Sequence, residues 1–126
     1  MKENISLRIS SLLSIFFVSV HISGDIIYGF EKGGTSNLII LPILSIWLYA
    51  TLVLPERKWG YIVIIAFSLL GLAVPIIHMK GAGLGKQVAD FQGGFFFVWT
   101  TITLGVTSIL SIILSIRGLW KRNRPG

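Results

Sequence analysis

Four apolar blocks, each close to the length that crosses a bilayer as a helix, leave this chain few folds to choose from. They cover about residues 9–30, 38–54, 59–77 and 94–116. A helix needs about 20 apolar residues to cross the hydrocarbon core, and in lipid its backbone hydrogen bonds must be satisfied within the helix. The segments between the blocks are rich in Gly, Pro and charged residues. We therefore expect residues 1–126 to form a single all-α domain, an integral membrane four-helix antiparallel bundle with four transmembrane spans.

The composition excludes several classes of protein. With 53% hydrophobic and 13% charged residues and a mean hydropathy of +0.82, the chain cannot present an ordinary soluble surface. The absence of cysteine excludes disulfides, thiolate metal sites and iron–sulfur clusters. The net charge of +6 comes from basic residues at the ends of the blocks, which indicates topology signals, so we expect no nucleic-acid partner. The expected partners are the lipid bilayer and either further copies of the chain or a larger membrane complex.

The distribution of Lys and Arg predicts the orientation in the membrane. The two terminal segments and the turn after the second block carry eight basic residues. The segments after the first and third blocks carry three, namely Lys32, Lys80 and Lys86. Because basic residues favour the cytoplasmic side, both termini and the turn "PERK" should be cytoplasmic, in the cell (inner) membrane. The first block also resembles a signal peptide, but no small-x-small cleavage site follows it cleanly, which favours a retained span.

A polar stripe runs along the first block and contains an acid and an imidazole. His21 and Asp25 are four residues apart and share one helix face with Ser14, with Ser10 or Ser11, and with Tyr28. An ionised Asp at the centre of a lipid-exposed helix costs about 2.5–3.5 kcal/mol, so the stripe should face the bundle interior. Counting along the helix puts His21 and Asp25 in the outer half of the span.

Two further blocks carry related stripes. In the third block, one side of the helix has small or polar residues that end in a second histidine, in the order Tyr61, Ser68, Gly71, Pro75 and His78. In the fourth block, Thr100, Thr103, Thr107, Ser111 and Ser115 recur at helical spacing, which is typical of a helix-packing seam. We expect this hydroxyl stripe to pack against other helices.

These residues predict an outward-facing polar site for a cation. His21, Asp25 and His78 are the candidate ligands for a divalent metal ion or carriers of a proton, and Glu31, Asp90 and Gln92 of the outer segments are further contributors. A haem held by the two histidines is a weaker alternative, because Asp25 lies one turn from His21.

Two other functions remain open at this point. In one, the polar residues only hold helices together and the chain is a non-catalytic accessory or oligomer-forming subunit. In the other, the same three residues serve a haem- or metal-dependent membrane enzyme, although the sequence favours a protein that is not an enzyme. The size and span count resemble the small multidrug-resistance transporters, but no span here contains their glutamate, so the resemblance implies nothing about activity.

Overall fold

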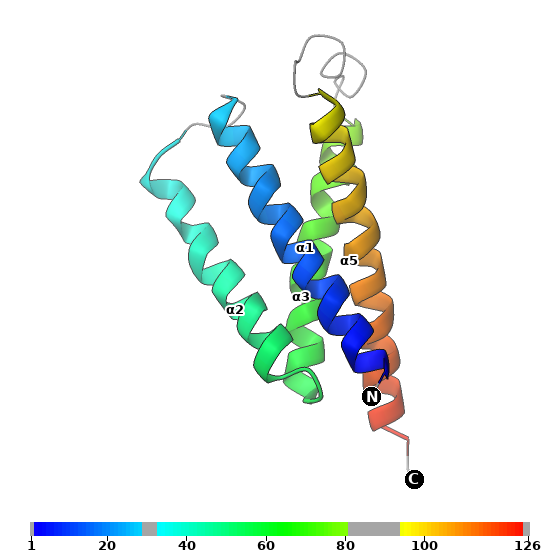
Figure 1. Ribbon diagram of the computed structural model, residues 1–126. Coiled ribbons are helices and arrows are strands. Elements are labelled where there is room, and N and C mark those ends of the chain that lie inside the picture. Colours follow the sequence, from blue (N-terminus) through cyan, green and yellow to red (C-terminus); the bar gives the residue numbers. More distant parts are fainter. Residues whose placement is uncertain (1, 29–32, 81–93, 125–126) are drawn as a thin grey trace.

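The computed structural model describes residues 2–28, 33–80 and 94–124, and within them the chain forms four long α-helices. Helix α1 is Lys2–Ile27, α2 is Ile40–Val53, α3 is Lys58–Lys80 and α5 is Gly94–Arg122 (Figure 1). A short 3₁₀ helix, η1 (Thr35–Ile39), leads directly into α2. The prediction of an all-α chain with four apolar helices is confirmed.

All four helices are long and apolar enough to cross a membrane. The candidate spans are Asn4–Ile27, Thr35–Val53, Lys58–Ile77 and Gly94–Asn123. The helices do not coincide with the apolar blocks, since α1 begins seven residues before position 9 and α5 continues six residues beyond position 116. The apolar blocks mark only the stretch suited to hydrocarbon, whereas backbone hydrogen bonding carries the helices on into polar sequence.

Helix α5 lies at the centre of the packing. It contacts both α3 and α1 extensively, whereas α1 and α3 contact each other little. The beginning of α1 and the end of α5 lie at the same end of the bundle (Figure 1). Helix α2 is peripheral and buries only Trp47, Ala50 and Thr51.

The interior is more polar than the surface. Among the buried side chains that the structure describes, thirteen are polar or charged and eight are hydrophobic, while large apolar side chains such as Phe95, Trp59 and Ile77 are exposed. A soluble protein buries its apolar side chains, so this distribution is the reverse of the usual one. It is typical of helices that pack through small and hydroxyl residues and face lipid.

Small residues bring α3 and α5 close together. A Cβ atom added to Gly71 would lie 2.8 Å from Ser108 Oγ, and one added to Gly105 would lie 3.4 Å from Pro75 Cγ. At the other end of the seam, the ring of Tyr61 packs directly on Gly118. The residues that share one side of the third span are therefore buried as far as Pro75.

Candidate functional site

The polar stripe of α1 faces the bundle interior, as predicted. His21 and Asp25 are buried, together with Ser10, Ser11 and Ser14 on the same helix. Tyr28 follows the last residue of α1 and is 53% exposed, but it lines the same small cavity as His21. Its backbone N–H also donates to the Gly24 carbonyl at 2.9 Å, so the helical spacing that puts it on the face of His21 continues to this residue.

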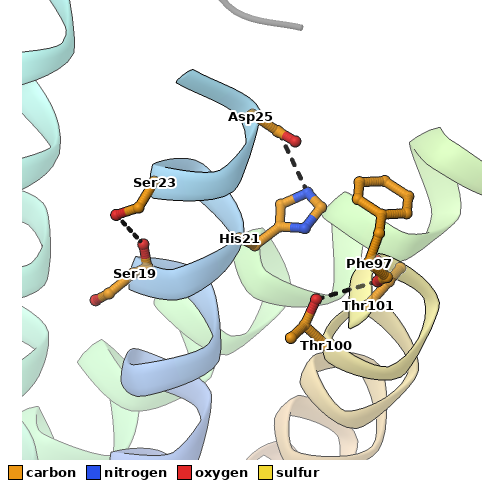
Figure 2. Close-up of polar contacts among 7 residues, drawn as sticks. All are labelled: Ser19, His21, Ser23, Asp25, Phe97, Thr100 and Thr101. Carbon is orange, nitrogen blue, oxygen red and sulfur yellow. Dashed lines mark hydrogen bonds and ion pairs between the residues drawn. The ribbon is translucent and has the colours of Figure 1, made fainter. Parts of the chain in front are cut away.

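His21 and Asp25 form a buried pair. The imidazole Nε2 lies 3.4 Å from the Asp25 carboxylate oxygen Oδ2, and the side chains are 2% and 12% exposed respectively (Figure 2). The helix sets this geometry, because residues four apart stack on one face. His21 is the deeper member, and Asp25 lies nearer the end of α1 and is slightly more accessible.

Helix α5 closes the other side of the pair. The His21 ring lies against the Phe97 ring with centroids 5.2 Å apart and an interplanar angle of 40°. A cavity of about 10 Å³ remains beside His21, lined in part by Gly24, Phe97 and Thr100. This volume is at the threshold for one water molecule. A haem would need far more space than the described residues leave beside His21.

The hydroxyl groups around the pair donate to backbone carbonyls. Thr100 and Thr101 donate to the Phe97 carbonyl at 3.0 and 2.7 Å, and Ser23 donates to the Ser19 carbonyl at 2.7 Å (Figure 2). Such bonds turn the hydroxyl hydrogen toward the helix itself. The hydroxyl hydrogens of Thr100 and Thr101 are therefore bonded within α5, and Ser23 points away from the pair (Figure 2).

The remaining candidate site residues cannot be placed against this pair. His78 lies within α3, but its side chain is outside the described residues, and so are Glu31, Asp90 and Gln92. Within the described part of the chain, no group of three or more His, Asp or Glu side chains could hold a metal ion. The structure thus brings His21 and Asp25 together and leaves the third ligand a prediction.

Hydroxyl groups on α1 form hydrogen bonds with hydroxyl groups on α5 deeper in the bundle. Ser14 donates to Thr107 Oγ1 at 3.0 Å, and Ser111 donates to Ser10 Oγ at 3.1 Å. These contacts confirm that the hydroxyl stripe of the fourth span is a packing seam, with Thr103 only partly buried at its margin.

The hydrogen bonds that join α1 to α2 were not predicted from the sequence. Trp47 Nε1 donates to Ser11 Oγ at 3.0 Å, Ser11 and Thr51 hydroxyls are 2.7 Å apart, and Thr51 donates to the Trp47 carbonyl at 2.8 Å. A tryptophan usually lies at a membrane interface. Its position in the middle of an apolar block was the signal that could have revealed this contact.

A second polar cluster, also missed, lies where α1, α5 and the turn between α2 and α3 meet. Asn4 Nδ2 donates to Glu56 Oε1 at 2.7 Å, and Arg122 Nη1 donates to the Glu56 carbonyl at 3.0 Å. They border a cavity of about 430 Å³ that Tyr61 and Lys121 also line. It lies at the end of the bundle opposite to the His21–Asp25 pair.

Comparisons with protein-family models, curated proteins and solved structures found no significant match to this chain. The function is therefore inferred from the buried pair and its surroundings.

Proposed function

We propose that this chain is an integral membrane protein in the inner membrane, an antiparallel four-helix bundle with cytoplasmic termini, whose His21–Asp25 pair binds or conducts a cation from the outside. The polar interior, the apolar exterior and the four long apolar helices support the membrane location. The basic residues support the orientation, because they concentrate at the end where α1 begins and α5 ends.

The burial of the His21–Asp25 pair is the observation that carries the proposed cation site. Of the three acidic residues that the structure describes, Glu3, Asp25 and Glu56, only Asp25 lies within a candidate span. Ionisable groups at such positions are expensive and most often mark ion or proton sites. Here the acid also has an imidazole at 3.4 Å, which is the group best suited to exchange protons near neutral pH.

A proton is the cation that this geometry accommodates best. The pair carries a net charge of −1 when it holds no proton and is neutral when it shares one, and apolar surroundings penalise net charge. A proton needs neither a third ligand nor space, whereas a metal ion needs several ligands and the adjoining cavity is only about 10 Å³. Asp25 is nearer the end of α1, so a proton from outside would reach the carboxylate first and the imidazole second.

Infrared difference spectroscopy on the protein in liposomes, between pH 8 and pH 5, tests this proposal. We expect a carboxyl or imidazole signal that Asp25→Asn removes and His21→Gln alters. Glu56→Gln is the matched control, because it neutralises an exposed acid outside the spans and should leave that signal intact. Identical spectra for the wild type and Asp25→Asn would refute a proton site at this pair.

Metal binding is tested on Asp25→Asn and His21→Gln together with a third variant, His78→Ala. Melting curves are recorded with and without zinc, manganese or nickel. Stabilisation by a metal that disappears in Asp25→Asn, His21→Gln and His78→Ala would assign the site to a metal ion, because losing one ligand weakens the whole set.

The peripheral position of α2 favours a second function, that of a non-catalytic accessory or oligomer-forming subunit. Most apolar side chains of this helix are exposed, including Leu41, Leu48 and Leu52. In that case Asp25→Asn would lower the stability of the bundle or its assembly and would leave proton exchange unchanged. Measuring the oligomeric state of the wild type and of Asp25→Asn in mild detergent separates this function from the first.

A further inference from the structure

A groove runs between the outer parts of α1 and α2 and deepens toward α3. Its wide part has a volume of about 440 Å³, and a narrower pocket of about 170 Å³ adjoins it, with Ile22, Ile40 and Leu44 lining both. The groove exists because α2 is close to α3 near its end and separates from it toward Ile40 (Figure 1). Where α2 comes close to α3, the buried side chain of Trp47 fills the space between them.

We propose that this groove holds one acyl chain of a lipid from the outer leaflet. The inference rests on the proposed membrane insertion and orientation, and it concerns a different part of the molecule from the His21–Asp25 pair. The ligand is identified by its chemistry, namely a single flexible hydrocarbon chain with a polar group at one end.

The walls of the groove are apolar even where they contain serine. Ser19 donates its hydroxyl hydrogen to the Ile15 carbonyl and Ser23 donates to the Ser19 carbonyl, each at 2.7 Å. Hydroxyls bonded in this way to their own helix add little polarity to a wall. Asn37 and the backbone of Gly33 and Gly34 lie at the outer rim, where a lipid's ester groups would be.

The length of the groove matches one leaflet. From Leu38 at the rim to Trp47 at the floor the rise is about 14 Å, counted at the helical rise per residue. Half of a hydrocarbon core is about 15 Å. An acyl chain that entered at the rim would thus end at Trp47, near the middle of the membrane.

The floor is rigid, and its shape suits a chain better than a helix. The Trp47 and Phe67 rings are stacked with centroids 5.9 Å apart, and Trp47 Nε1 is held by Ser11. A helix from a second copy is about 10 Å wide and could not enter the narrow 170 Å³ pocket above Trp47. A flexible chain one methylene wide could.

Trp47 provides the probe for a direct test. Of the four tryptophans, Trp59, Trp99 and Trp120 are exposed and can be changed to Phe, which leaves Trp47 as the only emitter. The protein is placed in phosphatidylcholine vesicles whose acyl chains carry bromine, a short-range quencher, either near the chain end or near the headgroup. We expect at least twofold stronger quenching of Trp47 by bromine near the chain end.

A pair of matched variants separates a lipid in the groove from lipid around the bundle. Leu44→Phe fills the groove and should at least halve the quenching, whereas Leu48→Phe makes the same change on a part of α2 that does not line it. Ile40→Phe obstructs the groove closer to the rim and serves if Leu44→Phe fails to fold, as judged by its helical circular dichroism. The proposal would be overturned if Trp47 were quenched as strongly in the groove-filling variant, Leu44→Phe or Ile40→Phe, as in the control Leu48→Phe.

Three outcomes distinguish the ways in which the proposal could fail. Cross-linking of wild-type α2 to the groove of another copy would show that a second chain is the occupant. Release of the protein from membranes by alkaline carbonate would refute membrane insertion and the lipid site together. Retention in the membrane with quenching that is insensitive to Leu44→Phe or Ile40→Phe would refute the lipid site alone.

Discussion

Replacing Ser11 by Ala should destabilise the bundle more than any other single loss of a hydroxyl group on α1. The Ser11 oxygen accepts from Trp47 Nε1 at 3.0 Å and lies 2.7 Å from Thr51 Oγ1, so one oxygen joins α1 to α2 twice. Trp47 is 2% exposed, and within the described ranges its indole N–H has no second acceptor. Ser11→Ala therefore removes two interhelical bonds and leaves a buried donor without an acceptor.

The cost follows from these contacts. Interhelical hydrogen bonds in membranes contribute about 0.6 kcal/mol each on average. A buried donor left without an acceptor adds about 1–3 kcal/mol, and relaxation of the Trp47 ring recovers part of that. We expect Ser11→Ala to lower the free energy of unfolding by about 1–3 kcal/mol.

Equilibrium unfolding in mixed micelles of mild and denaturing detergent measures this change. Ser19→Ala is the matched control, because its hydroxyl bonds only to its own helix and its loss should cost less than about 0.5 kcal/mol. A double-mutant cycle of Ser11→Ala with Trp47→Phe should give a coupling energy of about 1 kcal/mol. Equal losses in Ser11→Ala and Ser19→Ala would show that the contact does not stabilise the bundle.

Three other predictions concern packing, topology and metal binding. Gly71→Ala should lower the free energy of unfolding by about 1–3 kcal/mol, because its Cβ would lie 2.8 Å from Ser108 Oγ. Gly24→Ala is the control, because its Cβ would meet no atom within 4 Å. This variant should unfold at the same denaturant concentration as wild type or a higher one. A reporter fused after Gly126 should be active only in the cytoplasm, and external activity would reverse the proposed orientation. If the pair binds only a proton, zinc should shift the melting temperature of wild type and Asp25→Asn equally, and a larger shift in wild type would contradict this.

The sequence determined the helices and the faces they bury. Blocks of about 20 apolar residues leave the backbone only helical hydrogen bonding in lipid, so an all-α chain followed from length and composition. Helical spacing then placed His21 and Asp25 on one face with Ser14, and it placed Tyr61 on one face with Ser68. The structure buries all five, because a polar side chain costs least where another helix covers it.

Which residue meets which across the bundle was decided only by the tertiary structure. Ser11 and Trp47 are 36 residues apart, and Asn4 and Glu56 are 52 apart, so no local pattern connects them. The divergence of α2 that opens the groove above Trp47 likewise depends on how that helix crosses its neighbours. Spacing along one helix fixes the face that a side chain occupies, but its partner depends on the rotation, height and crossing angle of a second helix, which the packing of all the helices sets together.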